Sequence, residues 1–145
     1  MSDPVGSTRL ATRQDGPAVL AIDAIAAAGD SERQQHLREA VDSGECIVYE
    51  RDGQVLGFAT LKRGHFYGRD FIDLLFVASD ARRRGIARSL VRASLVAATT
   101  PRVFTSTNTS NTPMQTLLQS EGWSRSGELE GFDEGDPEVV YYRSR

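Results

Sequence analysis

Residues 74–90 are the segment of this chain that is most informative about its architecture. They read Leu74-Leu75-Phe76-Val77-Ala78-Ser79-Asp80-Ala81-Arg82-Arg83-Arg84-Gly85-Ile86-Ala87-Arg88-Ser89-Leu90. An apolar strand passes through a short basic loop into an amphipathic helix. The first N–H groups of a helix lack partners within it and lie at the positive end of its dipole. Gly85 lets the backbone approach phosphate oxygens closely, and small Ala87 keeps the next turn open. The segment therefore predicts an anion site suited to a diphosphate.

Four arginines surround this predicted site and supply positive charge: Arg82, Arg83, Arg84 and Arg88. A second interpretation needs no ligand. Arg84, Arg88 and Arg92 are spaced at i, i+4 and i+8, so they would form one solvated stripe on an ordinary helix. The strand before the loop and the helix after it favour the anion site, because such a motif requires that context.

A second informative block begins at Asn111 and reads Asn-Thr-Pro-Met-Gln-Thr-Leu-Leu-Gln-Ser-Glu-Gly-Trp. Met114, Leu117 and Leu118 form the apolar stripe of a short helix. Gly122 supplies a left-handed stop for that helix, and Trp123 then opens a strand.

Together these blocks resemble the GNAT N-acetyltransferase superfamily. Arg82-Arg83-Arg84-Gly85-Ile86-Ala87 is similar to its cofactor motif, Gln/Arg-x-x-Gly-x-Gly/Ala, and Asn111, Met114, Leu117, Gly122 and Trp123 match a second family pattern. The resemblance implies that acetyl-CoA is the co-substrate and that no metal is needed. It implies that the loop cradles the pyrophosphate, that the backbone groups of Phe76 and Val77 pair with the pantetheine amides, and that Asn111 contacts the pantetheine arm. The cofactor-binding residues are then Phe76, Val77, Arg82, Arg83, Arg84, Gly85, Ile86, Ala87, Arg88, Ser89 and Asn111.

The order of expected elements agrees with this resemblance. Hydrophobic periodicity and turn residues predict strands over 8–12, 45–51, 54–63, 69–77, 102–106, 123–132 and 138–143, and helices over 15–28, 31–43, 83–99 and from Asn111. Asp52-Gly53 predicts a hairpin turn, and 64–68 a loop. The order β-α-α-β-β-β-α-β-α-β-β is that of the α/β GNAT fold, with a central, mostly antiparallel mixed sheet flanked by helices. We expect a single domain over residues 1–145.

The resemblance also implies a reaction in which a primary amine attacks the thioester directly. A carboxylate on the central strand commonly removes the amine proton in this family, and Asp73 is the candidate catalytic residue. Strand alternation places Asp73 on the face of Leu75 and Val77. Alternatively, Asp73 binds a neighbouring backbone group or an arginine. His36 and His65 are interpreted as surface residues, although His65 could line the acceptor mouth.

The proton donor for the leaving thiolate is left open. Many family members have a tyrosine at the position where this chain has Leu118, which cannot give a proton. Tyr67, Tyr141, Tyr142, Ser110 and bulk water are the alternatives. Tyr141 and Tyr142 are expected to be packed strand residues. Because Leu118 stands at the tyrosine position, a second function also stays open, that of a non-catalytic acyl-CoA-binding or regulatory protein on the same fold.

The acceptor is expected to be a small-molecule or peptide amine. Six acids lie between positions 128 and 138, where they would attract a cationic amine or simply form a solvated hairpin: Glu128, Glu130, Asp133, Glu134, Asp136 and Glu138. An aminoglycoside, a polyamine, an amino acid derivative, a protein N-terminus and a lysine all remain open. A longer acyl donor is a variant of the same chemistry.

The composition of the chain bears on its number of domains, its partners and its location. The chain has 145 residues, 39% hydrophobic and 26% charged, which suits one compact domain. Its net charge of −3 argues against nucleic acid as a partner. The single cysteine, Cys46, excludes an internal disulfide, fits a reducing cytoplasm and is expected to be a buried hydrophobe. No signal peptide or membrane span is predicted, so we expect a soluble cytoplasmic protein, with a homodimer left open.

Overall fold

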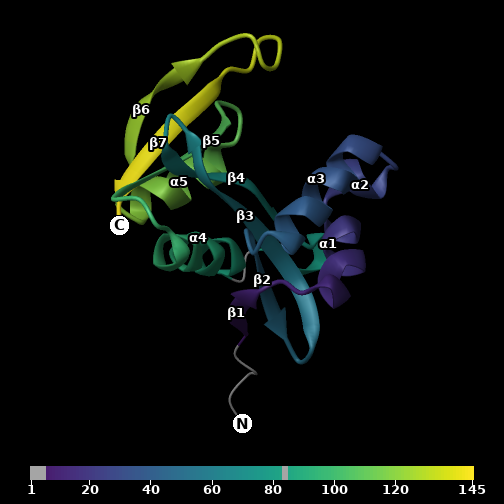
Figure 1. The fold of residues 1–145 in the computed structure, drawn as a ribbon. Coiled ribbons are helices and arrows are strands. Elements are labelled where there is room, and N and C mark those ends of the chain that lie inside the picture. Colours follow the sequence, from purple (N-terminus) through teal and green to yellow (C-terminus); the bar gives the residue numbers. More distant parts are fainter. Residues whose placement is uncertain (1–5, 83–84) are drawn as a thin grey trace.

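The computed structural model describes residues 6–82 and 85–145. Within these residues, the centre of the molecule is a seven-stranded sheet with strand order β1-β2-β3-β4-β5-β7-β6 (Figure 1). The strands are β1 (Ser7–Leu10), β2 (Cys46–Arg51), β3 (Gln54–Phe66), β4 (Arg69–Val77), β5 (Arg102–Asn108), β6 (Ser124–Leu129) and β7 (Glu138–Ser144). Neighbouring strands are antiparallel except β4 and β5, which are parallel. The predicted mixed, mostly antiparallel α/β fold is confirmed.

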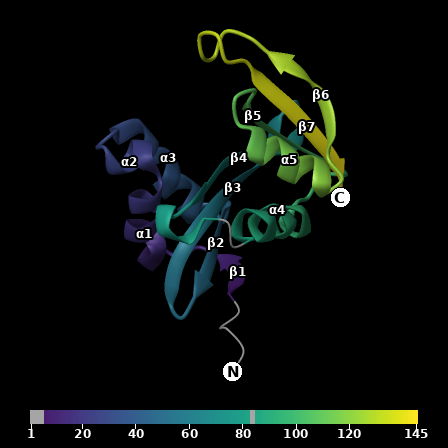
Figure 2. The same cartoon turned by 180° about the vertical axis from the view of Figure 1, so that it is seen from behind.

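Helices cover both faces of the sheet (Figures 1 and 2). On one face, α1 (Gly16–Ile22), α2 (Ala24–Ala27) and α3 (Ser31–Asp42) enclose a core that includes Val19, Leu37 and Phe58. On the other face, α4 (Ile86–Ala97) and α5 (Thr112–Ser120) enclose a core that includes Leu90, Leu118 and Tyr141. In the described residues, every helix falls short of the length and apolar character that a bilayer span requires.

The first predicted helix, over 15–28, is wrong in one respect, because the chain breaks it at Asp23. The backbone of Asp23 is extended, and its carboxylate accepts hydrogen bonds from the backbone N–H groups of Ile25 and Ala26. A side chain that satisfies the first N–H groups of a new helix favours a helix start over continuation. The same carboxylate is fully buried and binds Arg33 at 2.8 Å, so the break also attaches α2 to α3.

The region predicted as a loop over 64–68 is mostly strand. β3 continues to Phe66, and Tyr67-Gly68 form a two-residue turn with φ values of 51° and 78°. The ring of Phe66 packs on the rings of Phe71 and Phe104, with centroid distances of 4.9 and 5.1 Å. This aromatic contact joins β3, β4 and β5. The predicted Asp52-Gly53 hairpin is confirmed, with φ values of 53° and 74°.

Other boundaries differ modestly from the predicted ranges. The strand predicted over 123–132 ends at Leu129, and the helix predicted over 83–99 is observed from Ile86 to Ala97. Arg83 and Arg84 lie outside the described residues. Cys46 is buried as expected, and burial, with a smaller effect from nearby Asp15, raises the pKa of its thiol to about 12. A thiol with that pKa is inert as a nucleophile at neutral pH.

The parallel pair β4 and β5 is short, and the two strands then separate. Asp70, Phe71 and Ile72 pair with Val103, Phe104 and Thr105. The hydroxyl of Thr105 donates to the carbonyl of Ile72 at 2.9 Å, at the last of these pairs. Beyond Ile72, no strand in the described residues pairs with the β5-facing edge of β4. The sheet therefore opens between β4 and β5 at their carboxyl ends.

Buried Asp70 holds the closed end of this pair together. Its carboxylate accepts hydrogen bonds from the backbone N–H groups of Thr99 at 2.6 Å and Gly64 at 2.9 Å. Burial alone would raise the pKa of Asp70, but these donors outweigh it and hold the pKa below its usual value. The carboxylate joins the β3–β4 hairpin to the segment before β5, which fixes where the two strands begin to run side by side.

Candidate active site

The predicted anion loop begins where β4 ends. After Val77 comes a short 3-10 turn (Ser79–Ala81), then exposed Arg82, and α4 starts at Ile86 after Gly85. Gly85 is left-handed, with φ 76°, and no side chain of the described residues caps the helix at this position. The N–H of Ser89 donates to the carbonyl of Gly85 at 3.1 Å, so the N–H groups of Ile86, Ala87 and Arg88 lie in the turn before this bond. This geometry agrees with the anion site predicted from the sequence.

A glycine on β3 allows α4 to lie close to the sheet. A Cβ on Gly57 would come within 3.0 Å of the Ile86 side chain and of the Phe76 carbonyl oxygen, and within 3.2 Å of Leu90. Real Cβ atoms do not make such close contacts without a shift of the neighbours. The sequence analysis missed Gly57, because only the packing of α4 on β3 gives it a role.

Two arginines of the predicted stripe also have protein partners. Arg92 pairs with Glu121 at 2.5 Å, and Arg88 approaches the same carboxylate at 3.5 Å and the Ser120 hydroxyl at 3.3 Å. These contacts join α4 to the end of α5. Arg88 and Arg92 thus have the protein contacts expected from the interpretation that needs no ligand. The anion site at Gly85 stays a prediction.

The topology brings Asn111 to the same edge of the sheet as the anion loop. β4 and β5 are parallel, so their carboxyl ends lie at one edge, and Val77 ends one strand while Asn108 ends the other. Asn111 is exposed and caps α5, with its side-chain oxygen accepting from the N–H of Met114 at 3.2 Å. Phe76 and Val77 pair with Phe58 and Gly57 of β3, so their opposite backbone edge faces the opening. The two blocks recognised in the sequence therefore flank one opening.

Asp73 lies at the point where β4 leaves β5, on a β-bulge. Thr60 pairs with Leu74 and Leu61 pairs with Ile72, which leaves Asp73 as the extra residue between them. A bulge shifts the alternation of side chains. The prediction that Asp73 shares a face with Leu75 and Val77 is therefore wrong: those two residues pack against the α4 core, whereas Asp73 meets α3.

The partner of Asp73 is His36 of α3. His36 Nε2 lies 2.5 Å from Asp73 Oδ2, with 37% of the histidine side chain and 29% of the aspartate side chain exposed. The partner of Asp73 is thus a histidine and not the arginine or backbone group of the alternative interpretation. His36 lies partly at the surface, as expected, and the structure adds its contact with Asp73. The two residues are 37 positions apart, so nothing local in the sequence indicates the pair. His65 is exposed on β3, as expected.

Most of the alternative proton donors are engaged elsewhere. Tyr141 is fully buried and donates to Gln115 Oε1 at 2.9 Å, and the Ser110 hydroxyl binds Asp136 at 2.6 Å. Tyr142 packs on Phe104, with Arg102 over its ring. Tyr67 is 84% exposed at the tip of the β3–β4 hairpin. Tyr141 and Tyr142 are packed strand residues, as predicted.

Leu118 is fully buried in the core beneath α4 and α5. We therefore expect Leu118→Tyr to destabilise the protein by about 1–3 kcal/mol, because the larger ring must displace close-packed neighbours. Denaturant unfolding of the variant measures this cost. The exposed substitution Gln119→Tyr on the same helix provides the control for the ring itself. Wild-type stability in Leu118→Tyr, with faster thiol release, would instead indicate a vacant position for an acid.

Several carboxylates of the acidic hairpin have partners within the protein. Glu128 pairs with Arg125, Asp133 accepts from the Asn108 amide, and Asp136 accepts from Thr109 and Ser110. Glu138 differs, because its Oε2 atom is buried with no hydrogen-bond partner in the described residues. Burial raises the pKa of Glu138 above its ordinary value, a hydrogen bond with Ser106 opposes the rise, and the charges of Asp133 and Asp136 add to it. Both interpretations of the hairpin therefore stay open.

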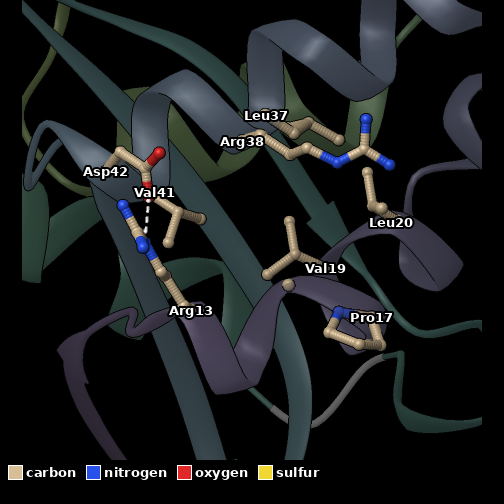
Figure 3. Close-up of a pocket in the computed structure, with 9 residues that line it drawn as sticks. Arg13, Pro17, Val19, Leu20, Leu37, Arg38, Val41 and Asp42 are labelled. Atoms are coloured by element: carbon tan, nitrogen blue, oxygen red, sulfur yellow. Dashed lines mark hydrogen bonds and ion pairs between the residues drawn. The ribbon is translucent and has the colours of Figure 1, made fainter.

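A separate hollow lies between α1 and α3, on the face opposite α4 (Figure 3). Apolar side chains such as Val19, Leu20 and Val41 form most of its wall, and Arg13 pairs with Asp42 across one end at 3.1 Å. The sequence analysis did not predict this hollow. We place the candidate active site at the β4–β5 opening instead, because the helix N-terminus, the bulged carboxylate and its histidine belong to that region.

A known protein family matches most of the chain that forms this opening and the glycine-led helix beside it. The model of the acetyltransferase (GNAT) family matches residues 23–123, and the chain belongs to this family. A GNAT acetyltransferase from Bacillus cereus ATCC 10987 is 33% identical, with 97% of this chain and 98% of that chain covered and a TM-score of 0.90. The search of curated proteins finds no match.

Two further solved structures share the fold. The ribosomal-protein-alanine N-acetyltransferase of Brucella melitensis is 25% identical, with 95% of this chain and 99% of that chain covered and a TM-score of 0.77. YncA from Salmonella typhimurium, solved with its cofactor acetyl-CoA, is 16% identical, with 97% and 94% covered and a TM-score of 0.76. The similarity to YncA shows a shared fold and nothing further.

Proposed function

We propose that this protein is an N-acetyltransferase that transfers the acetyl group of acetyl-CoA to a primary amine. The observation that best supports this proposal is the opening between β4 and β5. It lies at the edge of the sheet where α4 starts after Gly85. An extended chain fits beside the β4 edge, and an anion fits at the helix start. We propose that residues 1–145 act as one domain.

The residues present fit both the diphosphate and the pantetheine arm of acetyl-CoA. Left-handed Gly85 presents backbone without a side chain, and a Cβ there would enter space that no described residue fills within 4 Å. Arg82 and Arg88, with Arg83 and Arg84 of the same loop, supply positive charge for the diphosphate. Ile86, Ala87 and Ser89 complete the first turn, and Phe76, Val77 and Asn111 are the proposed contacts of the pantetheine arm. Acetyl-CoA supplies an acetyl group activated as a thioester.

The amine must lose a proton before it can attack. Asp73 serves as, or positions, the group that takes this proton. The position of Asp73 supports this role, because the bulged residue lies one position beyond the last pair between β4 and β5. A backbone N–H beside the opening would stabilise the developing oxyanion.

The acceptor is a primary amine of a small molecule or peptide. The Brucella relative acts, by its name, on the alanine of a ribosomal protein, which makes a peptide α-amine one class to test. The acidic β6–β7 hairpin would favour a cationic amine of any of these classes. Buried Leu118 at the position of the family tyrosine favours the second candidate function, a non-catalytic acyl-CoA-binding or regulatory protein.

A thiol-release assay over an amine panel separates these functions. The panel holds an N-terminal alanine peptide, a lysine peptide, a polyamine, an aminoglycoside and amino acid derivatives, each with acetyl-CoA. The enzyme is expected to release CoA with at least one amine and to form the acetylated product by mass spectrometry. Tight CoA binding by calorimetry with no product from any amine would favour the non-catalytic function.

A further inference from the structure

The His36–Asp73 pair connects two elements that are distant in sequence. Asp73 is the bulged residue of β4, one position beyond the last pair with β5. His36 lies on α3, between Gln35, which faces solvent, and Leu37, which is buried in the core. The helix thereby holds the ring at the 2.5 Å contact while 37% of the side chain is exposed.

The contact defines how the imidazole can work. When neutral His36 donates its Nε2–H to the Asp73 carboxylate, its lone pair is on Nδ1, and that nitrogen can accept a proton. The carboxylate then stabilises the imidazolium that forms and holds the ring in one tautomer and orientation. This is the role that a buried aspartate has beside the histidine of hydrolase triads. A carboxylate already bound to an imidazole is the weaker proton acceptor of the two groups at neutral pH.

We propose that His36 is the proton acceptor for the amine and that Asp73 is the residue that positions it. The proposal rests on the proposed N-acetyltransferase function and assigns the step left open there. The exposed part of the ring gives it access to the acceptor, directly or through one water. The sequence indicated Asp73, and the structure adds His36 as its partner.

The ammonium of the acceptor gives one proton to Nδ1 of His36 and becomes a neutral amine. Its nitrogen forms a bond to the acetyl carbon, and the bond between that carbon and sulfur breaks. The second amine proton goes to the departing thiolate, directly or through solvent. The imidazolium returns its proton to water, so each turnover yields an amide, a thiol and one released proton.

Three variants test the assignment with the best amine from the panel: His36→Ala, Asp73→Asn and the double variant. The exposed neighbour Gln35→Ala provides the control on the same helix. We expect His36→Ala to lower kcat by about 10²-fold, with the affinity for CoA unchanged, because base catalysis contributes about 10²–10⁴-fold. The double variant should lose no more than the worse single variant, since the two residues act as one unit.

Rescue by added imidazole distinguishes a catalytic role of His36 from a structural one. Added imidazole should restore acetylation in a concentration-dependent way in His36→Ala and leave Asp73→Asn, which keeps its own histidine, nearly unchanged. Product is measured by mass spectrometry, with the enzyme-free reaction subtracted.

Several outcomes would overturn the assignment. Wild-type kcat in His36→Ala together with a large loss in Asp73→Asn would make Asp73 the base. A loss in His36→Ala that imidazole does not restore and that adds to the loss from Asp73→Asn would make the pair structural. An inactive wild-type protein that binds CoA would overturn the proposed function together with this assignment, whereas the first two outcomes leave that function intact.

Discussion

Asp73→Asn is expected to lower turnover by about 10²-fold or more near neutral pH while CoA binding stays nearly intact. The amide keeps the size of the side chain and can still contact His36 Nε2, which now lies 2.5 Å from Asp73 Oδ2. It cannot stabilise an imidazolium or accept a proton. The carboxylate is 29% exposed and lies outside the main cores, so the fold should tolerate the change. Steady-state kinetics with the best amine and calorimetry with CoA measure the two effects.

The same chemical change elsewhere provides the control for Asp73→Asn. Asp52→Asn alters a carboxylate in the β2–β3 hairpin, where φ is 53° and an asparagine suits the left-handed turn. This variant should keep wild-type turnover. If Asp73→Asn also kept wild-type turnover and pH profile, Asp73 would have no part in the mechanism.

Gly85→Val is expected to weaken CoA binding at least tenfold, which corresponds to about 1.4 kcal/mol. Two physical effects act in the same direction. A β-branched residue strongly disfavours the φ of 76° that Gly85 adopts before α4, so the loop would move. Its side chain would also enter the space proposed for the diphosphate, where a Cβ has no described neighbour within 4 Å. Calorimetric titration with CoA measures the loss.

The control for Gly85→Val is a glycine with the same backbone strain at another place. Gly53 has φ 74° and open space around an added Cβ, and it lies in the β2–β3 hairpin. Gly53→Val should lower the free energy of unfolding without changing CoA affinity. Unchanged CoA affinity in a folded Gly85→Val protein would refute the assignment of the loop.

Local sequence features determined most of the elements and the glycine-led start of α4. Gly85 could be recognised because a glycine at a strand-to-helix junction acts through its own backbone and the first turn after it. The Asp52-Gly53 turn and the strands on either side of it are local for the same reason. The order of elements then indicated the acetyltransferase fold, and the family match confirms it.

Features that depend on contacts distant in sequence were decided by the tertiary structure alone. The bulge at Asp73 arises from the register between β3 and β4, and it reverses the face that simple alternation predicts. His36 acquires a role only when α3 packs on the sheet, and Gly57 only when α4 does. A sequence records periodicity and turn chemistry within a few residues. Register and side-chain pairing depend on which elements meet, and the free energy that selects them comes from burial across the whole sheet.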